Sequence, residues 1–156
     1  MKIEYNGKEV EAYRLTTKKK FTQEIFEGKK KVEIRAFSSF YEKMFFDPVK
    51  SAALSERIEN GGSAVDESGA YLIDQTMKDI DFARLTNYNG SWYLDVHITS
   101  ISVCAMVKED IEYLNNFFDF HDYNEEYKKF ENHPIEEVPI FFAIAIGDII
   151  NSHGFK

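Results

Sequence analysis

The longest apolar run of the chain is Ile140–Ile146, within the sequence VPIFFAIAIGDII at residues 138–150. A short apolar run between a proline and a glycine predicts a strand that is buried on both faces. The run is far shorter than the roughly 20 apolar residues that a helix needs to cross a bilayer. We therefore expect a soluble protein, with no membrane partner, whose sheet includes a fully buried strand at 138–150.

A second strand is predicted at residues 92–106, where apolar and polar residues alternate. The apolar residues change parity near Thr99–Ser100, so a regular strand would place them on opposite faces. They are Trp92, Leu94, Val96 and Ile98 before this point, and Ile101 and Val103 after it. A bulge or sharp bend would return them to one face, as strands of small barrels need.

The remaining pattern predicts one domain in which helices and strands are mixed. We expect a strand at 9–17, a helix at 18–28 and a strand at 30–37. Asp47 and Pro48 at the start and Gly61–Gly62 at the end predict a helix between them. Two more helices are expected at 108–118 and 122–130, the second starting from a pair, Asp122 and Glu125, that resembles a capping box. Residues 38–90 read as an insertion or lid region, irregular between 63 and 90.

Positive charge is concentrated in the first third of an acidic chain. The net charge is −8, but residues 1–50 contain 12 Lys and Arg against 8 Asp and Glu, while residues 51–156 contain 7 against 19. An acidic protein is not expected to coat nucleic acid indiscriminately. A local basic patch predicts a small anionic ligand or a short strand of nucleic acid.

Cysteine and histidine give little sign of a reactive or metal site. Cys104 is the only cysteine, so no disulfide within the chain is possible, and with no signal-peptide pattern we expect a cytoplasmic protein. Cys104 has no base nearby in the sequence, and we expect a small buried residue. Asp95 and His97 lie two residues apart on the polar face of the predicted strand, where we expect a surface pair; the alternative is that they enter a cleft. We expect neither a cofactor nor a metal site, because metal-ligand spacing is absent from the four histidines, His97, His121, His133 and His153.

The basic charge is densest in EGKKKVEIRAF, residues 27–37, where Lys30, Glu33 and Arg35 follow Gly28. A helix that ends at a glycine turn delivers the next side chain close to the start of a strand. Two cations that flank one carboxylate can hold a phosphate or the edge of a nucleobase. The alternative is a solvated strand face with a weak Glu33–Arg35 ion pair.

Lys18, Lys19 and Lys20 form a further cationic group at the start of the helix predicted at 18–28. The helix dipole disfavours cations there, so an anionic ligand held by Lys18 and Lys20 would offset the cost. The alternative is that these lysines extend freely into water. Several aromatic residues are candidates to stack on a base, although most are expected in the core: Phe37, Phe40, Tyr41, Tyr88 and Trp92.

The pattern G-x-K-x-x-E-x-R, at Gly28, Lys30, Glu33 and Arg35, resembles the signature of the ASCH family, and FTQEIFEG before it resembles the family's lead-in helix. The resemblance implies a PUA-like fold, an α+β small mixed β-barrel with peripheral helices and a cleft lined by the motif. It also implies RNA or a nucleotide as the partner. Some small bacterial members are reported as N4-acetylcytidine amidohydrolases or ribonucleases.

The resemblance leaves the activity open. In the small amidohydrolases the lysine works with a threonine three residues later and a more distant glutamate, but here Glu33 stands in the threonine position. Hydrolysis would need Glu33 as a general base on water, with Lys30 polarising the carbonyl.

We favour binding without catalysis, in which Lys30 and Arg35 hold a phosphate or exocyclic oxygen and Glu33 accepts a hydrogen bond from a base amine. Arg35→Ala is then expected to abolish binding with the Tm nearly unchanged. A third possibility is an interaction module that uses the acidic helices at 109–131.

Overall fold

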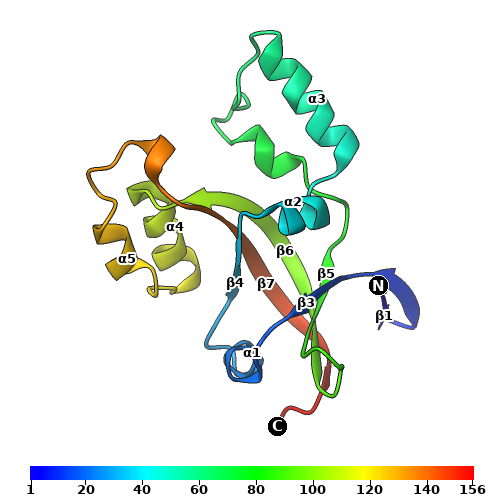
Figure 1. The fold of residues 1–156 in the computed structure, drawn as a ribbon. Coiled ribbons are helices and arrows are strands. Elements are labelled where there is room, and N and C mark those ends of the chain that lie inside the picture. Colours follow the sequence, from blue (N-terminus) through cyan, green and yellow to red (C-terminus); the bar gives the residue numbers. More distant parts are fainter.

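The computed structural model describes residues 1–156 and shows a mixed α+β fold built on one curled sheet (Figure 1). The five strands lie in the order β3–β5–β6–β7–β4, with β3 parallel to β5 and the other neighbours antiparallel. The sheet curls into a half-barrel. In chain order its strands are β3 (Tyr13–Thr16), β4 (Val32–Ala36), β5 (Phe82–Thr86), β6 (Tyr93–Ala105) and β7 (Ile140–His153).

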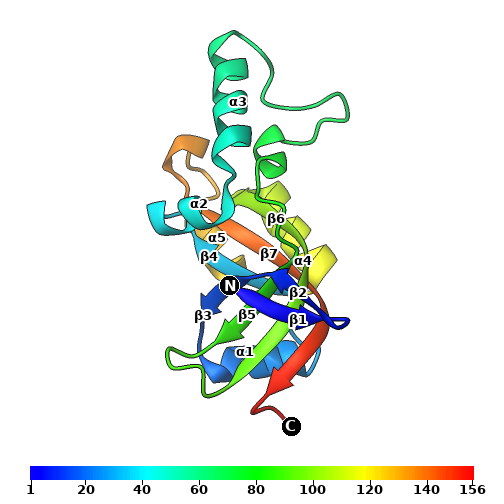
Figure 2. The same ribbon diagram turned by 90° about the vertical axis from the view of Figure 1, so that its right-hand side faces the viewer.

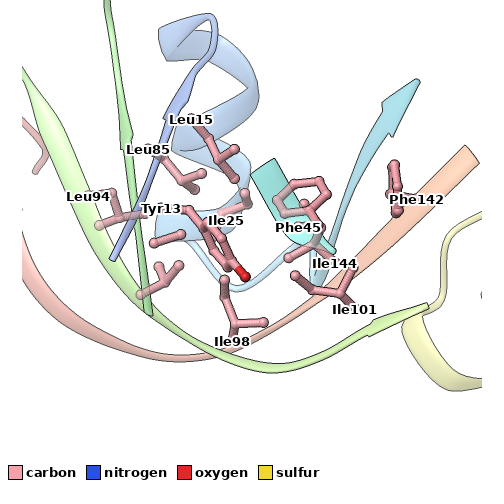
Figure 3. Close-up of a cluster of buried hydrophobic side chains, with 12 residues drawn as sticks. Tyr13, Leu15, Ile25, Phe45, Leu85, Leu94, Ile98, Ile101, Phe142 and Ile144 are labelled. Carbon is pink, nitrogen blue, oxygen red and sulfur yellow. The ribbon is translucent and has the colours of Figure 1, made fainter. Parts of the chain in front are cut away.

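The concave face of the sheet holds the larger hydrophobic cluster, which Figure 3 shows surrounded by the bent strands. Two helices close this side: α1 (Lys19–Phe26) contributes Ile25, and α2 (Ser39–Phe45) contributes Phe45. The sheet contributes the rest, namely Tyr13, Leu15, Ala83, Leu85, Leu94, Val96, Ile98, Ile101, Phe142 and Ile144.

The opposite face of the sheet carries a second cluster, which the helices α4 (Lys108–Phe118) and α5 (Asn124–Lys128) cover. Ile111 and Leu114 of α4 pack here against Phe141 and Ala143 of β7. Phe141 and Phe142 are both buried and belong to different clusters, so β7 is buried on both faces in this part. The prediction of a strand buried throughout 138–150 is wrong outside it, because Ile140 and Ile149 are 42% and 41% exposed. None of the helices combines the length and the apolar composition needed to cross a membrane.

The register of β6 against β7 shifts three times between Asp95 and Ser100, so the predicted irregularity is confirmed. The shifts bring Ile98 and Ile101, which differ in parity, into the same concave cluster. Gly147 of β7 lies opposite the shifts, and a Cβ atom built there would be 3.0 Å from the Cγ2 atom of Thr99. Glycine therefore permits the close approach of the two bent strands.

The helix predicted after Asp47 is confirmed as α3 (Pro48–Glu59). The Asp47 carboxylate accepts hydrogen bonds from the N–H groups of Val49 and Lys50, and Gly61 follows with φ of +82°. No residue of α3 is buried, and the helix projects away from the sheet together with the 3-10 helix η1 (Leu72–Gln75) (Figure 2). The predicted insertion range 38–90 thus holds this projecting arm, but also α2 and the sheet strand β5.

Two predictions of local structure are wrong. Residues 9–17 form two strands, because β2 (Lys8–Glu11) pairs with β1 (Lys2–Tyr5) and only β3 joins the sheet. The turn of this hairpin is Asn6–Gly7, with φ of 51° and 75°, as a two-residue type I′ turn requires. The other error concerns α5, which begins after Tyr123 without a side-chain cap, so Asp122 and Glu125 form no capping box. The 3-10 helix η2 (Ile135–Glu137) precedes β7.

Two aspartates cover the edge of β6 that extends beyond its pairing with β5. The Val103 N–H donates to Oδ1 of Asp74 at 2.8 Å, and the Ala105 N–H donates to Oδ2 of Asp110 at 2.7 Å. Acidic side chains on a bare strand edge hinder pairing with another chain. Burial raises the pKa of both carboxyl groups above the ordinary value, although the backbone hydrogen bonds act in the opposite direction.

We expect Asp74→Asn to stabilise the protein at pH 7. A carboxyl group whose pKa is raised by folding favours the folded state at low pH and opposes it once the pH exceeds the folded pKa. Asparagine keeps an acceptor for the Val103 N–H without the buried charge, so we expect the Tm to rise by about 2 °C at pH 7. Calorimetry should show the gain vanishing below about pH 4, where the carboxyl is neutral in both states. A Tm reduced at pH 7 as far as in Asp74→Ala would contradict this assignment.

Candidate basic-aromatic site

The turn between α1 and β4 has the geometry that the sequence predicts. Gly28 has φ of +76°, its N–H donates to the Ile25 carbonyl at 3.0 Å, and the Lys29 N–H donates to the Glu24 carbonyl at 2.9 Å. A left-handed residue at this position ends a helix at the lowest cost when it is glycine. The turn leads directly to Lys30, which only Lys31 separates from the start of β4 at Val32.

Lys30, Glu33 and Arg35 come together in space. The Lys30 Nζ atom lies 3.3 Å from Oε2 of Glu33, and the Arg35 Nε atom lies 3.5 Å from Oε1 of the same carboxylate. The side chains are 17%, 9% and 11% exposed, respectively. This burial excludes the solvated strand face considered as the alternative. In the sheet register Glu33 and Arg35 lie opposite Ile144 and Phe142, so they share the concave face with the core.

Arg35 also joins the two edges of the half-barrel. Its Nη1 group donates to the carbonyl of Thr16, at the end of β3, at 2.9 Å, and to the hydroxyl of Tyr41 in α2 at 2.8 Å. No strand pairing links β3 with β4. Because Arg35→Ala would remove both bonds, we now expect it to lower the Tm, which corrects the expectation of an unchanged Tm. Arg35 is therefore a poor position for separating binding from folding.

Exposed aromatic rings lie at both ends of this cluster. At one end Phe21, which is 41% exposed, lies 4.9 Å from the Lys20 Nζ atom and 5.6 Å from the Lys30 Nζ atom, measured from the ring centroid. At the other end the ring of Tyr41 lies 5.6 Å from Arg35 Cζ and 5.0 Å from the ring of Phe40, which is 65% exposed. We call this connected set the basic-aromatic row. Its members are Lys20, Phe21, Lys30, Glu33, Arg35, Tyr41 and Phe40.

The other residues considered from the sequence have different surroundings. Lys18 is the N-cap residue of α1, and its carbonyl accepts hydrogen bonds from the first turn. Phe37 stacks on Phe142 and Trp92 is buried, so both belong to the core, while Tyr88 is exposed in the β5–β6 loop. Phe21 was not among the predicted aromatic contacts. Its position directly after Lys18–Lys20 is the sequence signal that would have identified it.

A hollow of about 210 Å³ adjoins the row at Lys30. It is lined by Glu24 and Lys29–Lys31 on one side and by Phe118–Phe120 and Asp122 on the other. Two larger hollows, of about 750 and 460 Å³, lie beside the β1–β2 hairpin, and no residue of the row lines them. Volume alone would place a ligand there, but the predicted cations are elsewhere.

A buried ion pair lies on the far face of the sheet and was not predicted. Asp95 is completely buried, and its two carboxylate oxygens accept hydrogen bonds from Nε and Nη2 of Arg84 at 2.7 and 2.9 Å. The Asn151 amide donates to the same carboxylate at 3.0 Å and to the Glu4 carbonyl of the hairpin at 2.9 Å. The prediction of Asp95 as half of a surface pair with His97 is therefore wrong. The cluster braces the hairpin against the sheet.

Cys104 is buried, as predicted. Burial, with Asp110 and Asp74 adding to its effect, raises the pKa of the Cys104 thiol to about 12. The reactive thiolate form is thereby suppressed near neutral pH. No group of three or more His, Cys, Asp or Glu side chains is arranged to hold a metal ion.

The basic-aromatic row thus combines exposed rings, ammonium groups and a carboxylate flanked by two cations. Such a combination suits a ligand that has an aromatic face, negative charge and hydrogen-bond donors. The chain matches no protein-family model, no curated protein and no solved structure.

Proposed function

We propose that this protein is an ASCH-like domain of the PUA-like type that binds short single-stranded RNA, or a ligand of nucleotide size, at the basic-aromatic row. The observation that carries the proposal is the exposed ring of Phe21 close to two ammonium groups, those of Lys20 at 4.9 Å and Lys30 at 5.6 Å from its centroid, with Lys30 in contact with Glu33. The G-x-K-x-x-E-x-R resemblance adds independent support, because its lysine and glutamate are two of these residues.

Five residues of the row have a role in this proposal. A base stacks on Phe21, because stacking on an exposed aromatic ring tolerates any base and needs no deep pocket. Lys20 and Lys30, with Lys18 at the start of α1, hold phosphate oxygens. Glu33 accepts a hydrogen bond from an exocyclic amine. Arg35 uses Nη2, for which the protein offers no hydrogen-bond partner, since both of its side-chain hydrogen bonds come from Nη1.

We expect Phe21→Ala to weaken RNA binding by about tenfold, because stacking on an aromatic ring contributes about 1–3 kcal/mol per base. Lys30→Met should weaken binding as well and flatten its dependence on salt, since one phosphate contact is lost. The measurement is fluorescence anisotropy with a labelled six-nucleotide RNA at several salt concentrations. Phe117→Ala is the matched control, because Phe117 is also exposed, at 74%, but belongs to α4.

Unchanged affinity in both row variants would refute binding at this row. Mass spectrometry of the same mixtures, with an N4-acylated cytidine added, tests the hydrolase. Product that the wild type forms and Lys30→Met does not would identify an enzyme with its centre at Lys30 and Glu33. Binding of a basic protein partner that survives both substitutions and responds instead to changes in α4 and α5 would identify the protein-interaction module.

A further inference from the structure

An acidic turn faces the second lysine triplet of the chain. Asp119–Asp122 connects α4 to α5 and forms one wall of the 210 Å³ hollow whose other wall carries Lys29–Lys31. We call residues 119–122 the acidic turn. It lies beside the row, because Lys30 belongs both to the row and to the hollow.

The opposed charges do not pair across the hollow. Lys29 lies 3.6 Å from Glu27, Lys30 pairs with Glu33, and the carboxylate of Asp119 lies 2.6 Å from the Nε2 atom of His121. The acidic turn contributes no ion pair to any of the three lysines. Its negative charge therefore remains available to act on whatever approaches Lys29–Lys31.

Packing holds the acidic turn in place. Asp119 adopts a left-handed conformation with φ of 50°, and the Phe120 N–H donates to the Leu114 carbonyl of α4 at 3.1 Å. The ring of Phe120 contacts that of Tyr123 at 5.5 Å, and Tyr123 packs in turn on Phe141 in the core.

The surroundings of Tyr123 show that the acidic turn lies close to the row. Burial raises the pKa of Tyr123, and the nearby carboxylates of Asp122 and Glu33 add to the effect. One carboxylate from the acidic turn and one from the row thus both act on the same phenol. The C-terminal end of α4, directly before the acidic turn, carries a partial negative charge that adds to the negative charge of the turn.

We propose that the acidic turn sets the length of the bound RNA by repelling phosphates that would extend past Lys30 to Lys29 and Lys31. This inference rests on the proposed function. Lys18–Lys20 and Lys29–Lys31 flank α1, which at eight residues is about 12 Å long. Without the turn, the two triplets would form one cationic track that holds a long strand. With it, the favourable part of the track ends at Lys30, and only a short strand fits.

The test is the double variant Asp119→Asn/Asp122→Asn, compared with the wild type for binding of labelled oligouridylates of three and twelve nucleotides. Removing two charges that lie within a Debye length of the phosphates should strengthen binding of the longer strand roughly fivefold. Binding of the shorter strand should change by less than about twofold, because it does not reach the turn. For each oligouridylate, the affinity of the variant is compared with that of the wild type. The two lengths are not compared directly, because a longer RNA strand can also bind in more registers.

The matched control is Glu56→Gln/Glu59→Gln, which makes the same change in net charge on the exposed surface of α3, at the opposite end of the molecule from α1 (Figure 1). Equal gains for both strands, no gain for the longer strand, or the same gain in the control would overturn the inference while leaving RNA binding intact. If the wild type binds neither strand, the proposed function itself fails.

Discussion

Arg84→Met is expected to lower the free energy of unfolding by about 3–5 kcal/mol at pH 7. The substitution keeps most of the aliphatic length of the side chain but removes the guanidinium group that donates two hydrogen bonds to Asp95. Asp95 is completely buried, so its carboxylate would be left with the Asn151 amide alone. A buried charge without a charged partner is among the most destabilising features a fold can contain. Thermal unfolding should show a Tm reduced by about 10 °C.

A further measurement identifies the origin of this loss. Adding Asp95→Asn to Arg84→Met should restore much of the stability, because no buried charge remains. A deficit that is unaffected by Asp95→Asn would mean that lost packing of Arg84 on the Tyr93 ring, whose centroid lies 3.8 Å from Arg84 Cζ, is responsible.

Phe142→Ala is expected to cost about 3–5 kcal/mol, the range found when a fully buried phenylalanine is truncated. Phe142 is completely buried, and its ring lies 5.0 Å from those of Phe37 and Phe45 and 5.6 Å from that of Phe46. These rings come from α2 and the residues on either side of it, so the cavity would open where the helix packs on the sheet. Urea denaturation measures the loss.

The surface phenylalanine Phe117, which is 74% exposed, provides the control for Phe142. Phe117→Ala should change stability by less than about 0.5 kcal/mol. Phe142→Leu should cost less than Phe142→Ala, because leucine fills part of the same space. Equal losses in Phe142→Ala and Phe117→Ala would show that the concave cluster is not the core on which the fold depends.

Periodicity alone was enough to predict the long strands. The apolar run of β7 and the change of parity near Thr99–Ser100 in β6 are local signals, and they led to a buried strand, a bulge and a curved sheet. The helix α3 followed in the same way from Asp47 and Pro48. In each case the residues that determine the element are neighbours in the chain.

Elements that depend on distant partners were missed. β5 is five residues long and becomes a strand because β3 and β6 lie on either side of it. Asp95 looked like a surface residue, because nothing local indicates that Arg84 lies opposite it in the register. The β1–β2 hairpin is the exception, since Asn6–Gly7 is a strong local signal for a type I′ turn and could have been used.

The residues of the candidate site also fall into two groups, those that local sequence predicts and those whose position depends on distant packing. Lys30, Glu33 and Arg35 were predicted together, because a glycine turn and strand alternation are local and the ASCH resemblance covers the same window. Phe21 was missed, since its contact with Lys30 depends on how α1 lies against β4. The acidic turn could not be placed beside Lys29–Lys31 from the sequence, because α4 must first pack on the far side of the sheet.

The pairing of β4 has a consequence for how the protein is made. β4 carries Glu33 and Arg35, and its only neighbour in the sheet is β7, where Val32 pairs with Ala145. On the ribosome the basic segment is synthesised early, yet the strand that orders it is the last to emerge. Until then β4 has no strand to pair with. A chain interrupted before β7 therefore has the motif but not the site.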